Sequence, residues 1–213
     1  MKTDDLISML ASGPDVALAP RPSRATVLPL LAGVLASALL MWVLLGVRPD
    51  LLQALARPAF WIKVAFSGAL AATGWLAVKR LAVPGASTRR LPVYLGLPVL
   101  AIWIIAGAML LASAPALRPE LFWGSTWRYC PWLIPLLSLP VLAAVLRVMR
   151  TLAPTHLRLA GAAAGLASGA TAAVVYCLHC PEMSPIFVGF WYLLGMLISS
   201  AIGALVGPRA LAW

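Results

Sequence analysis

The sequence predicts an all-α fold, a polytopic membrane protein built as a bundle of six transmembrane helices with both termini in the cytoplasm. The 213 residues are 62% hydrophobic and only 10% charged, with a mean hydropathy of +0.96, which does not suit a soluble surface. Long apolar runs recur along the chain, and the basic residues are distributed unevenly between the segments that connect them. This composition excludes an ordinary cytoplasmic enzyme, a disordered regulator and a disulfide-rich secreted module.

Residues 1–25 are expected to form a cytoplasmic tail, because their acidic start and their Gly and Pro residues do not fit a signal peptide. Thr3 can cap a short amphipathic helix whose first turn holds Asp4 and Asp5. Its apolar side chains share one face: Leu6, Met9 and Leu10. A helix this short is unstable alone, so it would become ordered in a partner's groove or on the inner leaflet. A frayed tail without function is the third alternative.

Six apolar runs within residues 26–207 are interpreted as a six-helix transmembrane domain, and residues 208–213 as a short cytoplasmic tail. Charges or clusters of Pro, Gly and Ser separate the runs. Three prolines in the fourth run should kink it, but no charge interrupts it. The runs cover residues 26–47, 58–78, 92–113, 131–146, 157–176 and 185–206.

The basic residues favour one orientation of these spans. With the amino terminus inside, eleven Lys and Arg fall in inner segments and five in outer segments. This excess is the positive-inside bias, which explains the net charge of +10 without nucleic-acid binding. The inner residues are Lys2, Arg21, Arg24, Lys79, Arg80, Arg89, Arg90, Arg147, Arg150, Arg158 and Arg209; the outer ones are Arg48, Arg57, Lys63, Arg118 and Arg128.

Small residues four apart mark the fifth and sixth spans and predict close packing of helix backbones. The main interpretation is packing within one bundle, and a homodimer face is the alternative. The residues are Gly161, Gly165 and Gly169 in the fifth span and Gly195, Ser199, Gly203 and Gly207 in the sixth.

The three cysteines all fall on the predicted outer side. Cys130 begins the fourth span, and Cys177 and Cys180 follow the fifth. A Cys130–Cys180 disulfide is feasible if the two α carbons come within about 7 Å, and it would leave one cysteine over. The thiolates, with His179 and Glu182, could instead bind a soft metal ion. The plain alternatives are an inert Cys177 and a solvated His179.

Other chemistry lacks its residues. Lys63 is the one charge within a span, and it lies close enough to the outer end to snorkel to the surface. Phosphate-binding loops, zinc-protease pairs and serine-hydrolase elbows are missing from the sequence, which disfavours hydrolysis, and a transporter is disfavoured by the lack of intramembrane charge. The enzymatic alternative is a membrane thiol-disulfide oxidoreductase using Cys177 and Cys180, with His179 favouring a thiolate.

Taken together, these features resemble the NrsF family of bacterial integral-membrane anti-sigma factors. The resemblance covers essentially the whole chain and depends on a combination of features: the start Met-Lys-Thr-Asp-Asp-Leu-Ile, six spans, Cys130-Pro131 before the fourth span, and Cys180-Pro181-Glu182 before the sixth. It implies an inner-membrane protein that holds an extracytoplasmic-function sigma factor inactive at the cytoplasmic face and releases it under heavy-metal or oxidative stress.

The resemblance also implies which residues act. Cys130 and Cys180 match the family's two periplasm-facing sensing cysteines, and Cys177 has no clear counterpart. The sigma factor and the lipid bilayer are the expected partners, with no direct nucleic-acid contact, no enzymatic activity and no cofactor. The residues expected to contact the sigma factor are those of the tail: Thr3, Asp4, Asp5, Leu6, Ile7, Met9 and Leu10.

Overall fold

The computed structural model describes Thr3, Asp5, Ser8 and residues 24–83, 85–152 and 154–212. Within these residues the regular structure is entirely helical, which confirms the predicted all-α class. The described residues contain six helical segments that are long and apolar enough to cross a membrane. They are α2 (Arg24–Leu44), α4 (Pro58–Leu81), α5 (Leu91–Ala112), α7 (Cys130–Arg150), α8 (Leu157–Tyr176) and the continuous segment Pro185–Ala210.

The last of these segments changes its winding along its length. It consists of α9 (Pro185–Phe187), a π-helical stretch η2 (Val188–Tyr192) and α10 (Leu193–Ala210). The six segments match the six predicted runs closely. The main differences are in α7 and α10, which each continue four residues beyond the predicted run, to Arg150 and Ala210. Helix α7 does so although Pro135 and Pro140 lie inside it, and α10 extends into the predicted tail of residues 208–213.

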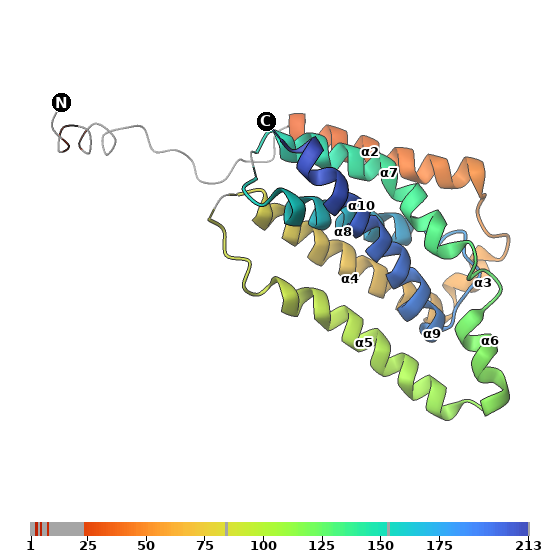
Figure 1. The fold of residues 1–213 in the computed structure, drawn as a ribbon. Coiled ribbons are helices and arrows are strands. Elements are labelled where there is room, and N and C mark those ends of the chain that lie inside the picture. Colours follow the sequence, from red (N-terminus) through yellow and green to blue (C-terminus); the bar gives the residue numbers. More distant parts are fainter. Residues whose placement is uncertain are drawn as a thin grey trace.

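Short helices that hydropathy did not indicate lie between the long ones. They are α3 (Leu51–Leu55), the 3-10 turn η1 (Pro115–Leu117) and α6 (Arg118–Trp123). In Figure 1, α3, α6 and α9 lie at one end of the bundle, and α2 begins and α10 ends at the other. We call these the cysteine end, which holds Cys130, Cys177 and Cys180, and the tail end, which holds Arg24 and Ala210.

Helix α8 is the centre of the packing and contacts α10, α4, α7 and α2. Its glycines explain how closely α10 approaches. A Cβ built on Gly161 would clash with the carbonyl oxygen of Gly203 and lie 2.8 Å from the Cα of Gly207. A Cβ on Gly165 would lie 2.8 Å from the Cα of Ser200. The small-residue stripe therefore packs within the chain, as the main interpretation predicted. The homodimer remains a prediction, and the stripe does not support it because α10 already covers it.

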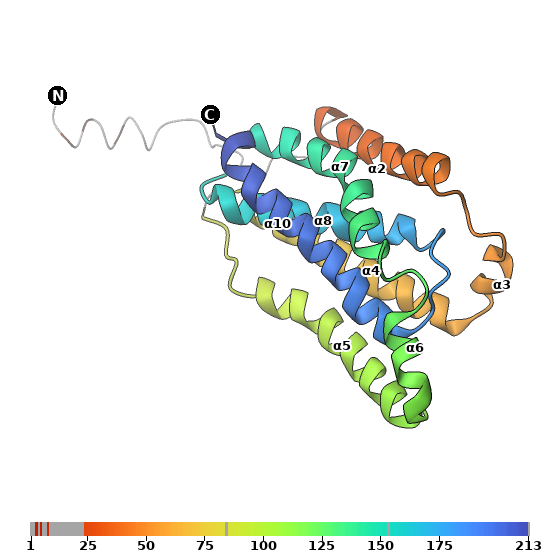
Figure 2. The ribbon, with the colours of Figure 1, turned by 45° about the vertical axis from the view of Figure 1, so that its right-hand side comes forward.

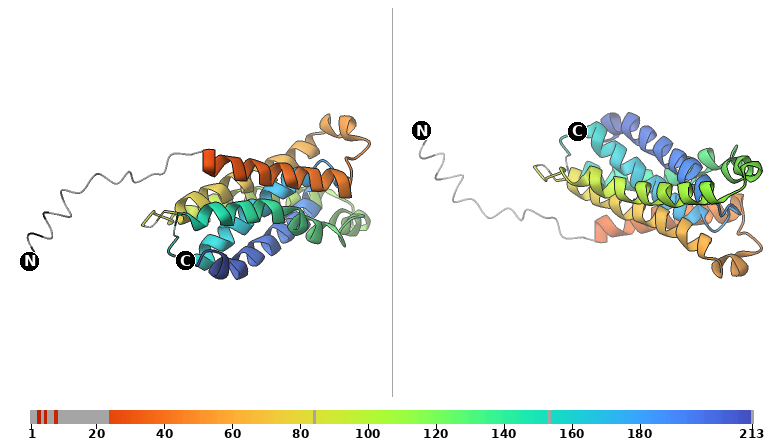
Figure 3. Two further views of the ribbon diagram at one scale, coloured as in Figure 1. Left: turned by 90° about the horizontal axis from the view of Figure 1, so that it is seen from above. Right: turned by 90° about the horizontal axis from the view of Figure 1, so that it is seen from below.

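Helices α2 and α5 lie on opposite sides of the bundle, as the views from above and below show (Figure 3). Helix α5 lies beside α4 at the edge (Figure 2) and buries only Leu91 and Ile102. Large apolar side chains are exposed along both helices: Leu28, Leu31, Leu35 and Leu39 on α2, and Leu97, Leu100, Ile104 and Leu111 on α5. Contiguous exposed apolar surfaces of this kind are typical of a face that contacts lipid or another apolar partner.

Candidate functional site

The cysteine end brings all three cysteines into one buried cluster. Cys130, Cys177 and Cys180 each have 0% exposure and belong to the same apolar core. All three are free thiols. Cys130 begins α7, while Cys177 and Cys180 follow α8, so two neighbouring helices bring these residues together.

Thr126 joins the two cysteines that the sequence singled out. Its carbonyl oxygen accepts a hydrogen bond of 3.0 Å from the backbone N–H of Cys130. Its hydroxyl oxygen lies 3.9 Å from the Sγ atom of Cys180. The start of α7 and the loop after α8 therefore share one residue as a contact, and sequence analysis did not identify it.

Lys63 is buried at this end, so the expectation that it snorkels to the surface was wrong. Its side chain is 1% exposed, and Nζ donates hydrogen bonds to the carbonyl oxygens of Cys180 at 2.9 Å and Glu182 at 3.0 Å. Nζ also lies 5.6 Å from the ring centroid of Tyr192 and 5.9 Å from that of Phe60. Carbonyl dipoles and aromatic faces thus compensate the buried ammonium group. The physical reason for the error is the loop after α8, which covers the lysine.

A second cation reaches the same loop. Arg48 is 7% exposed and donates from Nη1 to the carbonyl oxygen of Cys180 at 3.2 Å. Its Nε and Nη2 atoms each bind the carboxylate of Asp50 at 2.7 Å, the only ion pair within the described residues. This hydrogen bond lowers the pKa of the Asp50 carboxyl and raises that of the Arg48 guanidinium. The Cys180 carbonyl therefore accepts hydrogen bonds from two cationic side chains.

His179 and Glu182 hold the loop from two further sides. The Nδ1 atom of His179 lies 2.9 Å from the carbonyl oxygen of Gly46, and since a carbonyl only accepts, Nδ1 is the donor. Glu182 Oε1 accepts hydrogen bonds of 2.7 Å from both the backbone N–H and the hydroxyl of Ser125. Gly124 makes this approach possible, because it has a φ of +55° and a Cβ there would lie 2.7 Å from the carboxylate.

These contacts bear on the proposed metal site. Among the residues that the structure describes, no three His, Cys, Asp or Glu side chains are placed to hold a metal ion. His179 binds Gly46 and Glu182 binds Ser125, so each has a structural contact of its own, separate from Cys177. The arrangement is a cluster of thiols inside a tethered loop.

Cys177 behaves as a buried, protonated thiol. Its Sγ atom donates to the carbonyl oxygen of Ala173 at 3.1 Å, within its own helix. Burial raises the pKa of the Cys177 thiol to about 11, against an opposing effect of the Lys63 charge. A dithiol oxidoreductase needs an attacking thiolate, whose formation a raised pKa disfavours. The burial of Cys177 and its raised pKa therefore count against Cys177 as the attacking thiol of the enzymatic alternative.

The tail end carries most of the basic side chains. Nine Lys and Arg of the described residues lie there, and five lie at the cysteine end, where Lys63 and Arg48 are buried. Of the predicted tail site, Thr3 and Asp5 are helical and exposed, and the Ser8 hydroxyl donates to the Asp5 carbonyl at 3.0 Å. Asp4, Leu6, Ile7, Met9 and Leu10 lie outside the described residues.

Comparison with known proteins gives a family. The family model described as "NrsF: Negative regulator of sigma F" matches residues 10–213. A curated relative from Azospira oryzae, named "Probable anti-sigma-F factor NrsF", is 54% identical over 213 residues and covers 100% of both chains. A relative from Caulobacter vibrioides, named "Anti-sigma-F factor NrsF", is 40% identical over 215 residues, again with 100% of both chains covered. No solved structure matches. The chain therefore belongs to the NrsF family of negative regulators of sigma F.

Proposed function

We propose that this chain is an anti-sigma factor of the bacterial inner membrane, which holds an extracytoplasmic-function sigma factor inactive at the cytoplasmic face and releases it when Cys130 and Cys180 respond to oxidative or heavy-metal stress. Family membership and the names of both relatives support the anti-sigma role. Such a protein acts by binding, so the proposal assigns it no enzymatic activity. The observation that carries the proposal is that the cysteines and the start of α2 lie at opposite ends of one bundle.

Membrane placement is supported by the surface of the bundle. The six helical segments contain candidate spans of 19 to 26 residues, of which the shortest is Thr26–Leu44 within α2, and each has the length and hydropathy of a span. The most apolar 18-residue stretches of α5 and α2 both have a mean hydropathy of 2.4, yet only 11% and 17% of them, respectively, are buried inside the bundle. An exterior this apolar needs a hydrocarbon environment.

The distribution of charge supports the orientation. Positive residues are enriched on the cytoplasmic side of membrane proteins, and the tail end carries nine of the fourteen described Lys and Arg. Two of the other five, Lys63 and Arg48, are buried in the cysteine end and add little to the surface charge there. This orientation assigns the tail end to the cytoplasm and the cysteine end to the oxidising periplasm.

The arrangement of α7 and α8 supports a relay between the two ends. These helices pack against each other, and the segment between Arg150 and Leu157 connects them at the tail end. Cys130 and Cys180 lie at the other, open end of the pair. A bond between Cys130 and Cys180 would link α7 and α8 at the cysteine end. A shift of one of these helices along the other would then move the segment that connects them at the tail end.

The chemistry at the sensing end can take two forms. In oxidation, the two thiols lose two protons and two electrons to a peroxide or to another disulfide, and an S–S bond forms. In metal capture, a soft ion displaces the thiol protons and binds the thiolates. A full shift from bound to free sigma factor needs a differential of about 5.5 kcal/mol. A disulfide contributes about 2–4 kcal/mol, which is less than this, so one disulfide would shift the balance between bound and free sigma factor only in part.

The orientation can be tested with introduced cysteines, since the native thiols are buried. Gln53→Cys places a thiol on exposed α3 at the cysteine end, and Thr155→Cys places one at the tail end. We expect a membrane-impermeant maleimide to label the first variant in whole cells and the second only after lysis. The wild-type chain gives the background. The reverse pattern would overturn the orientation, and labelling of both in whole cells would remove the relay.

The sigma-binding role can be tested by co-purification from the native host. We expect a sigma factor to copurify with the full chain and to be lost when residues 1–12 are deleted. Leu6→Ser with Leu10→Ser should have the same effect, because it removes the apolar face. Val16→Ser with Leu18→Ser is the matched control within the tail and should retain binding. If no sigma factor accompanies the full chain, the proposal loses its main support.

A further inference from the structure

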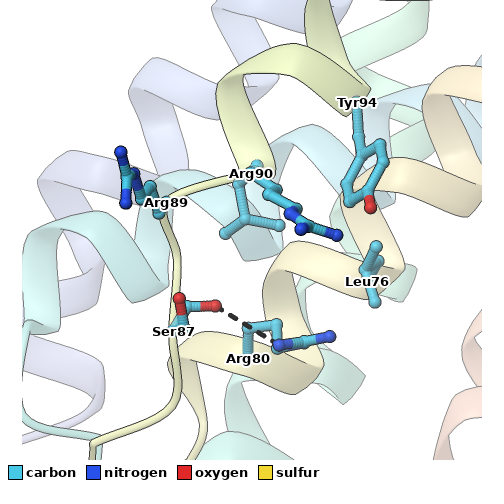
Figure 4. A pocket seen from close by; sticks show the side chains of 7 residues that line it. Leu76, Arg80, Ser87, Arg89, Arg90 and Tyr94 are labelled. Atoms are coloured by element: carbon cyan, nitrogen blue, oxygen red, sulfur yellow. Dashed lines mark hydrogen bonds between the residues drawn. The ribbon is translucent and has the colours of Figure 1, made fainter.

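A pocket at the tail end is lined by three arginines. It lies between the end of α4 and the start of α5, has a volume of about 410 Å³ and is lined by Arg80, Arg89 and Arg90 together with Tyr94. Figure 4 shows the guanidinium groups of Arg80 and Arg90 and the Tyr94 hydroxyl on the same side of the pocket, while Arg89 turns the other way.

No acidic side chain pairs with these arginines within the described residues. Within the described residues, the Arg80 guanidinium donates one long hydrogen bond, of 3.4 Å, to the carbonyl oxygen of Ser87. Arg80 and Arg90 are exposed. Two guanidinium groups and a phenol present several donors to one space, an arrangement that suits a phosphate group.

An apolar cavity lies further along the seam between the same two helices, α4 and α5. This second cavity has a volume of about 230 Å³ and is lined only by apolar side chains of the two helices, among them Ala69 and Phe66 of α4 and Pro98 and Ala101 of α5. Helix α5 contacts little besides α4 and the α9–η2 segment, so the seam opens at the edge of the bundle. A basic pocket above an apolar groove matches a molecule with an anionic head and a hydrocarbon chain.

We propose that the α4–α5 seam binds an anionic phospholipid, with its phosphate held by Arg80, Arg90 and Tyr94 and an acyl chain in the apolar cavity. The inference rests on the membrane placement proposed above. Basic pockets between helices on the cytoplasmic side of membrane proteins bind anionic headgroups. A zwitterionic lipid fits less well, because its cationic amine would face two guanidinium groups. An acidic segment of a protein partner would satisfy the arginines but would leave the apolar cavity empty.

The proposal is tested on the full chain by native mass spectrometry in mixed micelles of phosphatidylglycerol and phosphatidylcholine. We expect wild type to retain phosphatidylglycerol selectively. Each juxtamembrane arginine contributes about fivefold to the binding of an anionic lipid, so Arg80→Gln with Arg90→Gln should weaken the affinity roughly 25-fold. Arg158→Gln with Arg209→Gln is the matched control, since both residues are exposed at the same end and neither lines the pocket. The control should keep the wild-type selectivity.

Further arms separate the sources of the anion. Inorganic phosphate should fail to displace the lipid, and Ala101→Phe, which fills the apolar cavity, should lower retention of both lipids. Full displacement by phosphate, or equal behaviour of the two arginine pairs, would overturn the proposal. The proposal would also be overturned if Arg80→Gln with Arg90→Gln kept the lipid but lost the sigma factor, because the pocket would then bind a protein. Failure of the wild-type chain to insert into liposomes would reject the membrane placement itself, a result distinct from insertion without lipid selectivity.

Discussion

The Nζ atom of Lys63 donates a hydrogen bond of 2.9 Å to the carbonyl oxygen of Cys180, across 117 positions of sequence. This bond places a buried positive charge directly on the backbone of a proposed sensing cysteine. The same ammonium binds the carbonyl oxygen of Glu182, so it holds the loop on both sides of Pro181. The loop's position thus depends on a residue of α4, and a change there should alter how Cys180 is presented.

Lys63→Met is therefore expected to loosen the loop. The substitution leaves the partly buried Glu182 carbonyl without its donor, and the loss should cost up to about 1–3 kcal/mol, the range for a fully buried group. We expect a lower melting temperature in detergent and faster maleimide labelling of Cys180, read by peptide mass spectrometry. Lys79→Met, which removes an exposed lysine of the same helix, should change neither. Wild-type labelling and melting in Lys63→Met would mean that the lysine does not hold the loop.

The reactivity of Cys177 should depend on pH in a defined way. Its pKa is raised to about 11 from an ordinary value of 9.0, so the folded chain holds the thiol proton more tightly than the unfolded chain. Its contribution to stability is full below pH 9 and is lost as the pH rises through about 11. In the folded protein, alkylation of Cys177 should keep rising up to about pH 11. In the denatured chain it should level off above pH 9, and the same plateau in the folded protein would contradict the raised pKa.

Close packing of α8 on α10 predicts opposite effects for two glycines. A Cβ on Gly165 meets the backbone of Ser199 and Ser200, whereas a Cβ on Gly68 of α4 meets nothing within 4 Å. Gly165→Ala should lower the free energy of unfolding by about 1–3 kcal/mol, because the helices must separate. Gly68→Ala should leave it unchanged or raise it by up to about 1 kcal/mol, through the better helix propensity of alanine. Denaturation in mixed micelles measures both free energies of unfolding. Equal losses in the two variants would argue against close packing of α8 on α10.

Local sequence patterns were sufficient to predict the helices but not the surroundings of the thiols. A run of apolar residues is a local property, so all six spans could be predicted from hydropathy alone. The spacing of Gly161 and Gly165 likewise indicated a packing face, which α10 fills. The burial of Lys63 and Arg48 could not be predicted in this way, because their acceptors belong to a loop more than 100 residues further along the chain.

A different sequence signal did point toward Lys63. An ionisable residue within an apolar span is costly unless it has partners, so its presence indicates a functional or structural contact by default. Its position near the end of the span favoured snorkelling instead. What decided the outcome was the loop at Glu182, which is held by Ser125 and closes over the lysine.

The sensing role of the cysteines predicts separate effects on binding and on release. Cys130→Ser with Cys180→Ser should leave sigma-factor binding intact, because the cysteines lie at the end of the bundle opposite to the start of α2, but should abolish induction of a sigma-dependent reporter by peroxide or a soft metal. Cys177→Ser is the matched control. Its hydroxyl can donate to the Ala173 carbonyl as the thiol does, so both binding and induction should remain. Normal induction in the double variant would reject the sensing role, and loss of induction in Cys177→Ser would show that the third thiol takes part.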